Sequence, residues 1–255
     1  MMLLAFLGDF GDGFRFIFEE RDSVGGDVRI GGLAEIADLT VTHLLLSGVA
    51  VLIAAAIAVP LGLYLGHIGK GEFLAISTSN IGRAIPSLAL LAFFIAFLGI
   101  GFANVCAVLV LLAIPPILTN TYVGVRQVNA DAVDAARGMG MSGMQIVRSV
   151  RLPLALPIIF GGIRTSTVNV VATATIAPLA NVQTLGEPIV TPQTYGTAGQ
   201  IGAAIVVALI TLAADVGLGA LQRAFTPKGL KLSPGATPRG KRFSIPLHRR
   251  SSVQT

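Results

Sequence analysis

A polar stretch at residues 126–155 separates two long apolar runs, and its residue types predict two short helices rather than a catalytic site. Asn129 is placed to cap a short helix, and the alanines that follow it favour that helix. Gly138 and Gly140 are expected to end it. Small side chains give this helix a face that would seat closely in a groove on another protein: Ala132, Ala135 and Ala136.

The second half of the stretch predicts another short helix. Ser142 and Gln145 have the spacing of a capping box, in which a hydroxyl and an amide side chain satisfy free N–H groups at a helix start. This helix is expected to run to about Arg151, before Pro153 leads into the next apolar run. The predicted unit is a helix, a glycine break and a second helix.

Residues that could bind a metal or take part in catalysis are scattered along the sequence. His43, His67 and His248 lie too far apart to form a metal site, and no His, Asp and Glu cluster occurs near one interface. The segment 235–242 contains Gly-Lys but lacks the Ser or Thr that a phosphate-binding loop requires next, so this chain is not expected to hydrolyse ATP. The single cysteine, Cys106, excludes a disulfide within the chain.

The composition requires a membrane environment. Of 255 residues, 53% are hydrophobic and 12% are charged, with a mean hydropathy of +0.79, which is too apolar for a soluble domain of this size. Four runs carry few or no charges: Leu39–Gly66, Ala84–Val125, Leu156–Ala180 and Gly199–Leu221. The second run is too long for one span of about 20 residues, and Gly99-Ile100-Gly101 followed by Asn104 supplies a break in its middle. The sequence therefore predicts an all-α membrane protein with five spans.

Charge asymmetry orients the five spans. Residues 1–42 hold eight acids and three arginines, whereas the tail after Leu221 holds eight bases and no acid. Because Lys and Arg concentrate on the cytoplasmic side, the C-terminus is predicted inside and the N-terminus outside, which makes residues 126–155 cytoplasmic. The pI of 9.9 reflects the basic residues of the tail. The positive-inside rule and attraction to anionic lipid headgroups explain these residues, so nucleic acid is not an expected partner.

Three regions follow from this arrangement. Residues 1–40 form an external segment, in which recurring Phe residues favour an amphipathic helix in the outer interface, with partial disorder as the alternative. Residues 41–221 form the transmembrane domain. Residues 222–255 form a basic cytoplasmic tail that is predicted to be disordered.

Two charges fall inside predicted spans. Arg164 lies about eight residues, or about 12 Å, inside one span, and Asp215 lies at a similar depth from the same face in another. In one interpretation the two pair between helices, which lowers the cost of each charge. In the other, Arg164 extends to the interface and Asp215 faces a wet cavity.

A candidate solute path consists of prolines and small polar residues near or within the spans. The prolines either break helices and expose carbonyls to a solute or simply kink the bundle, and the amides either line a conduit or bridge helices. These residues are Pro86, Ser87, Pro115, Pro116, Asn120 and Asn169.

The spacing within the polar stretch resembles the cytoplasmic coupling loop of ABC importer permeases. That loop has the pattern Glu-Ala-Ala, three residues, Gly, nine residues, Ile-x-Leu-Pro. Asp for Glu and Val for Ile are conservative departures here. The matching positions are Asp134, Ala135, Ala136, Gly140, Val150, Leu152 and Pro153.

Other blocks resemble the permeases of osmoprotectant importers, which carry glycine betaine, carnitine, choline or proline betaine. The similarity covers roughly residues 41–221, although Ala177–Gly186 keeps only Leu-Gly of a glycine-rich stretch in the family. Four blocks carry the resemblance: Ile85–Leu91, Pro115–Tyr122, Ala135–Met141 and Leu152–Thr165.

The resemblance implies a type I importer core of five helices in the cytoplasmic (inner) membrane. It also implies a second permease copy or a paralogue, two ATPase subunits that hold ATP and Mg²⁺, and an extracytoplasmic binding protein, with no cofactor in this chain and membrane lipid around it. Because the chain has no Trp and three scattered Tyr, the aromatic cage that usually holds a quaternary ammonium is expected in another subunit.

Two other functions stay open at this point. A type I permease for another solute, such as methionine, a phosphonate or an oxyanion, would carry the same loop. An ion-coupled secondary carrier would need inverted repeats and buried coupling carboxylates, and of these the sequence offers only Asp215.

Overall fold

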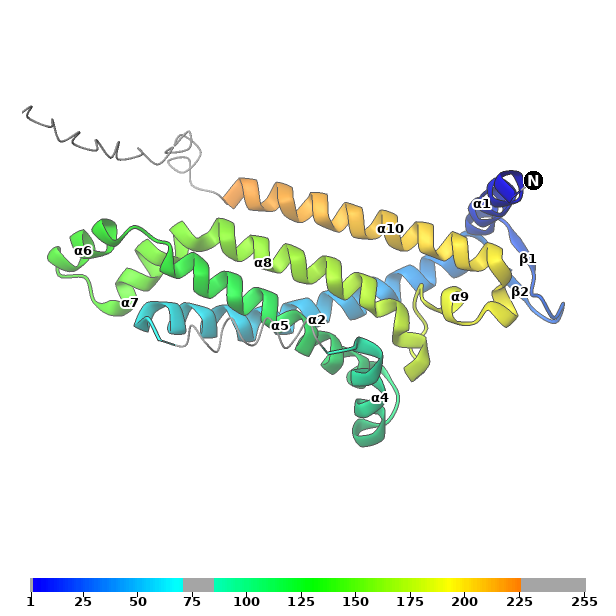
Figure 1. The fold of residues 1–255 in the computed structure, drawn as a ribbon, viewed down its shortest axis with the longest axis horizontal. Coiled ribbons are helices and arrows are strands. Elements are labelled where there is room, and N and C mark those ends of the chain that lie inside the picture. The colour runs from blue at the N-terminus through cyan, green and yellow to red at the C-terminus, as the bar shows by residue number, and fades with distance from the viewer. Residues whose placement is uncertain (1, 71–84, 226–255) are drawn as a thin grey trace, which may run out of the picture.

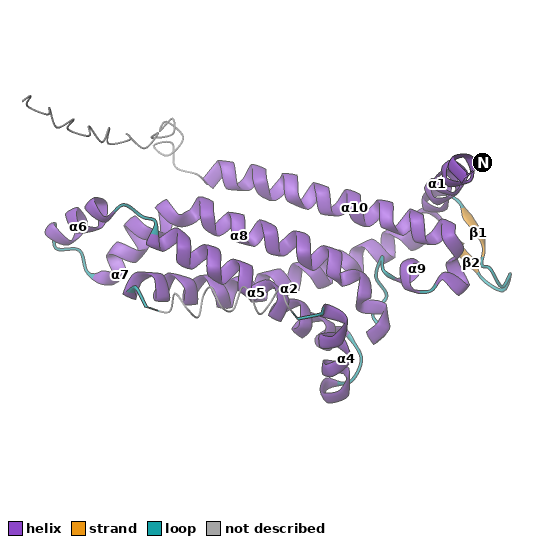
Figure 2. Cartoon of the chain, in the orientation of Figure 1, coloured by secondary structure: helices purple, strands orange, loops and turns teal. Residues whose placement is uncertain are grey.

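The computed structural model describes residues 2–70 and 85–225, which form a bundle of long helices (Figure 1). Within this part of the chain the strands form one short antiparallel hairpin at an end of the bundle (Figure 2). The elements in chain order are α1 (Met2–Phe18), β1 (Glu20–Asp22), β2 (Arg29–Gly31), α2 (Gly32–Ile68), α4 (Ser87–Leu98), α5 (Phe102–Arg126), α6 (Ala130–Gly138), α7 (Gly143–Ile146), the π-helix η1 (Val147–Arg151), α8 (Leu152–Thr173), the 3₁₀-helix η2 (Ala174–Ala180), α9 (Glu187–Val190) and α10 (Pro192–Phe225).

Helices α2, α5, α8 and α10 run along the long axis of the bundle (Figure 1). Gly66 of α2 lies beside Val125 of α5, and Gly124 of α5 lies beside Ala155 of α8. Helices α2 and α5 therefore end, and α8 begins, at the same end of the bundle, where α6, α7 and the last residues of α10 also lie. We call this the loop end, and we call the opposite end, with α1, the strands and α9, the hairpin end.

Glycines allow α2 and α5 to approach closely. A Cβ atom on Gly62 would lie 2.7 Å from Thr121 Cβ, and one on Gly66 would lie 2.7 Å from Val125 Cβ. Small residues permit such approach between helices in a membrane. The core that forms around this contact includes side chains that are 0% exposed: Leu46, Ala50, Ala54, Ala58, Leu109, Ala113 and Ile117.

The described residues contain four helices that are long and apolar enough to cross a membrane, not the five predicted. Helix α4 has only 12 residues, which is about 18 Å of helix against a hydrocarbon core of about 30 Å. However, α2 ends at the loop end, and α5 begins at the hairpin end, where the Gly101 N–H donates to Ala180 O (2.8 Å). The connection 69–101, of which residues 71–84 are not described, therefore joins opposite ends of the bundle.

The predicted break between α4 and α5 is confirmed. Gly99 (φ 73°) and Gly101 (φ 123°) adopt backbone angles that favour glycine, and Asn104 Nδ2 donates to Gly99 O. The break directs α4 away from the bundle axis (Figure 1). By contrast, α5 continues through Pro115 and Pro116 to its end, so the interpretation of this pair as a helix break is wrong.

The N-terminal segment belongs to the fold. Helix α1 packs on α10, where a Cβ on Gly202 would lie 2.7 Å from Gly13 O. Phe16 is 1% exposed and packs in a cluster with residues of α2 and α10. Among the residues whose helical spacing predicted an amphipathic helix, Phe10, Phe14 and Phe18 are about half exposed, whereas Ile17 is buried against the bundle.

Both predicted domain boundaries fall within helices. Helix α2 begins at Gly32 rather than near residue 41, and α10 continues to Phe225, beyond residue 221. Most of the predicted tail, residues 226–255, lies outside the described residues.

Gly62→Ala is expected to destabilise the bundle, because the new Cβ would overlap Thr121. Overpacking of this kind costs about 1–3 kcal/mol. Gly48→Ala on the same helix is the matched control, since nothing lies within 4 Å of a Cβ there and Ala favours a helix over Gly by about 1 kcal/mol. Thermal unfolding in detergent should show a lower midpoint for Gly62→Ala only, and equal midpoints would contradict the close helix contact.

Candidate functional site

The two short helices at the loop end begin as predicted. Asn129 Oδ1 accepts the Asp131 N–H (2.7 Å), which caps α6. At the start of α7, Ser142 Oγ accepts the Gln145 N–H (3.4 Å) and Gln145 Oε1 accepts the Ser142 N–H (2.7 Å), which completes the predicted capping box. These bonds join residues two or three positions apart, which explains why local sequence predicts them.

Helix α6 ends in a Schellman motif. The Gly140 N–H donates to Arg137 O (2.9 Å), and the Met141 N–H donates to Ala136 O (3.1 Å). Gly140 has φ 81°, a conformation that glycine adopts without steric cost. The predicted glycine break therefore falls at Gly140, whereas Gly138 is the last helical residue of α6.

The second loop helix does not stop before the membrane. Helix α7 passes into η1 and then into α8 without a break, so the prediction of a separate short helix is wrong. The Leu152 N–H donates to Val147 O in a wide π turn. Pro153 has no N–H to donate, and the wide turn lies immediately before it. As a result, α7 and α8 form one continuous helix.

An apolar cluster holds the two loop helices together. Val133, Ala136 and Ile146 are 5%, 1% and 2% exposed, and Val150 packs against them. Leu152 packs instead on the adjoining cluster of α5 and α8. Because Ala136 faces inward, the prediction that it belongs to a partner-binding face is wrong, and its small side chain serves to bring α6 close to α7.

The outward face of the loop carries Asp134, Ala135, Met139 and Met144. Met139 is 76% exposed and Met144 is 60% exposed. Arg137 Nη1 donates to Asp134 Oδ1 at 3.3 Å on this surface, a type of pair that adds little stability. Exposed methionines can adapt their shape to a contacting surface, and this face is the most exposed apolar part of the loop.

Arg151, predicted only as the approximate end of the second loop helix, joins the loop to α2. Its Nη1 donates to Gly66 O (3.0 Å) and to His67 O (3.2 Å). These carbonyls lie in the last turn of α2, where the helix itself supplies no donor, and a cation is favourable at a helix C-terminus. Arg151 and His67 are 84 positions apart, so no local pattern signals this contact.

Four of the six predicted path residues line one cavity of about 190 Å³ between α4, α5 and α8. They are Ser87, Pro115, Pro116 and Asn169. The lining does not include the other two: Pro86, which precedes the first turn of α4, and Asn120, whose Nδ2 donates to Pro116 O (2.8 Å) within its own helix.

The two charges inside the bundle lie next to each other. Arg164 Nη2 donates to Asp215 Oδ2 (2.5 Å), and Arg164 Nε donates to Asp215 Oδ1. The side chains are 40% and 29% exposed because they face a groove of about 470 Å³ between α8 and α10. Asn169 lines both this groove and the cavity at Pro115 and Pro116, so the two spaces are neighbours along α8.

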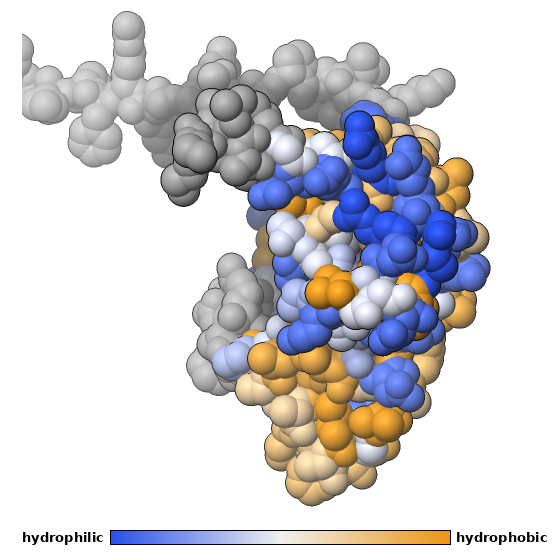
Figure 3. All heavy atoms as spheres, turned by 90° about the vertical axis from the view of Figure 1, so that its right-hand side faces the viewer, coloured by the Kyte–Doolittle hydropathy of each residue, from blue (hydrophilic) through white to orange (hydrophobic). Residues whose placement is uncertain are grey.

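The hairpin end is polar. Figure 3 looks onto this end and shows hydrophilic side chains gathered over the upper part of the view. A cavity of about 400 Å³ there is lined by acidic residues that include Glu35 and Glu187, and Tyr195 Oη donates to Glu35 Oε1 (2.6 Å). Burial, and then the negative charge of Glu35, raise the pKa of Glu187. This end therefore presents negative charge and polar groups to its surroundings.

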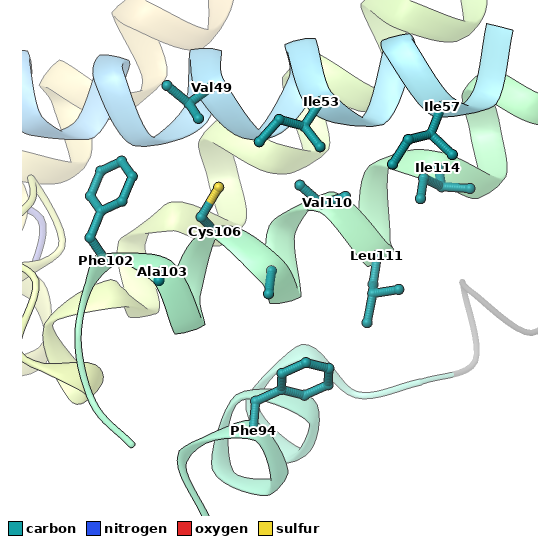
Figure 4. Close-up of a pocket in the computed structure, with 11 residues that line it drawn as sticks. Val49, Ile53, Ile57, Phe94, Phe102, Ala103, Cys106, Val110, Leu111 and Ile114 are labelled. Carbon is teal, nitrogen blue, oxygen red and sulfur yellow. The ribbon is translucent and has the colours of Figure 1, made fainter. Parts of the chain in front are cut away.

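A further cavity of about 690 Å³ is apolar and lies between α2, α5 and α4 (Figure 4). Ile53 and Ile57 of α2 and Val110 of α5 line it, and Phe94 of α4 lies across from them. Its lining residues are all apolar, so it lacks the polar groups that fix a charged solute.

The fold and these sites define a class of protein, a helical membrane permease with a polar loop that is continuous with a spanning helix. Residues 58–229 match the family described as "Binding-protein-dependent transport system inner membrane component". Over 190 residues the chain is 40% identical to the glycine betaine/carnitine/choline transport system permease protein OpuCB of Bacillus subtilis (strain 168), covering 74% of this chain and 88% of that protein. It is 38% identical over 193 residues to the choline transport system permease protein OpuBB of the same organism, covering 75% and 89%.

Among solved structures, an inward-facing conformation of the MetNI methionine ABC transporter is similar in fold, with a TM-score of 0.65 and 22% identity over 76% of this chain and 98% of that chain. The chain belongs to the family of binding-protein-dependent ABC transporter permeases. It is a multi-pass permease of the inner membrane and a non-enzymatic part of its transport system, and membership implies an ATPase and a binding protein as partners.

Gly140→Ala is expected to weaken the coupling of ATP hydrolysis to uptake, because a positive φ costs an L-residue about 1 kcal/mol. That cost lowers the population of the observed loop conformation by about a factor of five. Gly138→Ala is the matched control, since Gly138 is helical and nothing lies within 4 Å of a Cβ there. ATP-driven uptake by the complete transporter should fall severalfold for Gly140→Ala and stay at the wild-type rate for Gly138→Ala. Equal rates for the two variants would show that the Schellman motif is not needed for coupling.

Proposed function

We propose that this chain is the permease subunit of an ATP-driven importer of osmoprotectants, which carries quaternary ammonium compounds such as glycine betaine, carnitine and choline. One observation carries the proposal: the chain is 40% and 38% identical to permeases named for these solutes, over 88% and 89% of their lengths. The loop geometry supports the coupling role, because Gly140 ends α6 with a turn and Asp134 and Ala135 are exposed, where an ATPase could contact them.

A pair of ATPase subunits supplies the energy and holds ATP and Mg²⁺. When these subunits close, they displace the loop at residues 126–155. The displacement passes into α8 through η1, and into α2 through the hydrogen bonds of Arg151 to Gly66 and His67. Two permeases, either two copies of this chain or one copy and a paralogue, then open outward, accept the solute and reset after hydrolysis.

The chain crosses the membrane five times, with its N-terminus outside and its C-terminus in the cytoplasm. Two observations support this topology: α2 and α5 run in the same direction, so the connection 69–101 returns between them, and bases concentrate in the tail. Residues 1–40 are then external, with the exposed face of α1 at the outer lipid interface. Residues 41–221 form the transmembrane domain, and residues 222–255 form a basic tail on the cytoplasmic side.

The binding protein docks at the hairpin end, where polar and acidic side chains face outward. The chain has no Trp and three Tyr, so the aromatic cage for the quaternary ammonium belongs to that partner. Import of methionine is a weaker proposal, because the likeness to the methionine transporter is one of fold at 22% identity.

Uptake of radiolabelled glycine betaine, carnitine and choline tests the proposed function. The complete transporter in proteoliposomes should take up these solutes with ATP inside, and an inactivated ATPase subunit should reduce uptake to background. Uptake that persists with the inactive ATPase would point to an ion-coupled carrier. Competition by methionine, without competition by choline, would point to another solute.

Cysteine labelling tests the topology and the docking surface. Cys106 is 7% exposed and is the only cysteine of the chain, so an introduced surface thiol is readily distinguished. A membrane-impermeant maleimide added to intact cells should label Val24→Cys, which is 68% exposed at the hairpin end. It should label Met139→Cys, at a position 76% exposed at the loop end, only after permeabilisation. Crosslinks to the ATPase should form from position 139 and not from position 24, and the reverse pattern would refute the topology.

A further inference from the structure

We propose that the groove between α8 and α10 is a transient binding site for a zwitterionic solute, with the solute carboxylate on Arg164 and its cationic group facing Asp215. This inference rests on the proposed function and adds to it the residues that the solute meets inside the permease.

The placement of the ion pair is the first support. Arg164 and Asp215 lie well inside two spanning helices, where an uncompensated charge is costly. Their side chains are 40% and 29% exposed to a groove of about 470 Å³, so a solute in the groove would meet both charges. That volume falls in the range of small-molecule sites, about 300–1,000 Å³.

The unused hydrogen-bonding capacity of Arg164 is the second support. A guanidinium has five N–H groups in a planar fork, and the contact with Asp215 uses Nε and Nη2. Nη1 remains to donate to a carboxylate. Gly219 of α10 lies beside the guanidinium, where a Cβ would be 3.3 Å from Nη1, so glycine at this position allows Arg164 to reach Asp215.

The charge pattern of the groove selects the class of solute. A carboxylate joined to a quaternary ammonium places a negative group on Arg164 and a positive group near Asp215, which adds no net charge to the interior of the membrane. A quaternary ammonium has no N–H to donate, so proximity to the Asp215 carboxylate is sufficient for it. Choline lacks a carboxylate and would engage only the Asp215 side.

The rest of the lining suits passage rather than tight binding. The groove is lined by Gly161, Thr165, Val168, Asn169 and Gln222 besides the pair, with no aromatic residue to form a cage. Weak binding is what a transport path requires, because the solute has to leave again. Asn169 continues this lining into the cavity at Ser87, Pro115 and Pro116, so the site lies on a path between helices.

The test compares initial uptake rates of glycine betaine and choline by the complete transporter at saturating binding protein. Arg164→Gln should lower the betaine-to-choline ratio about tenfold, which corresponds to the loss of one charge-assisted hydrogen bond. Asp215→Asn should shift the ratio in the opposite direction, because it removes the partner of the cation. Thr167→Val is the matched control and should leave the ratio unchanged, since Thr167 lies on the same helix outside the groove and its Oγ1 donates to Ile163 O.

A double variant separates a solute site from a structural clamp. Arg164→Gln with Asp215→Asn leaves no unpaired charge and keeps groups that can hydrogen-bond between α8 and α10. It should co-purify with the ATPase yet lose about tenfold in betaine uptake. Wild-type uptake by the double variant, or an unchanged ratio in both single variants, would overturn the site. Transport of neither solute by the unaltered protein would instead refute the proposed function, and this inference with it.

A labelling experiment tests the site with the ion pair intact. Thr165→Cys places a thiol on an exposed groove position, and the permease–ATPase complex is treated with a maleimide in the absence of binding protein. Millimolar glycine betaine should slow the reaction, choline should slow it less, and the double variant should abolish the protection. A reaction rate that glycine betaine does not change would overturn the proposal.

Discussion

The joint between the loop at residues 126–155 and the bundle is the physical constraint on which the rest of the structure depends. Helices as short as α6 and α7 are marginal in water by themselves. Here they are held by the apolar cluster around Ala136 and by the continuous helix from α7 into α8. Arg151 adds a second attachment at the end of α2. A force on the loop therefore reaches two spanning helices at once.

Several polar side chains inside the bundle share one face of α8. Residues four positions apart share a helix face, so Thr165, Asn169 and Thr173 form one polar stripe along α8. This stripe lines the groove at Arg164 and Asp215 and the cavity at Pro115 and Pro116. Ser166, which lies off this stripe, faces the core, where its Oγ donates to Ala113 O (2.9 Å). The result is a polar path beside a tightly packed apolar core.

Close backbone approach sets several residue choices that hydropathy does not explain. Gly62, Gly66 and Gly162 each lie where a Cβ would meet a neighbouring helix at 2.7 Å. Gly186 belongs to the segment that departs from the glycine-rich family pattern, and it has no space for a Cβ beside the Thr175 carbonyl. Its neighbour Leu185 is 0% exposed. The Leu-Gly pair that remains of the family pattern is therefore required by packing at the hairpin end.

By itself the amino-acid sequence determined the membrane class, the helix starts at Asn129 and Ser142, and the break at Gly99 and Gly101. These features depend on hydropathy, or on hydrogen bonds between residues a few positions apart, so local sequence is sufficient to predict them. Only the tertiary structure decided that Ala136 faces inward and that Arg164 meets Asp215, 51 positions away. It also decided that the loop helix continues into α8 and that Arg151 reaches α2. These outcomes depend on which elements pack together, and the pattern along one helix does not specify its neighbours.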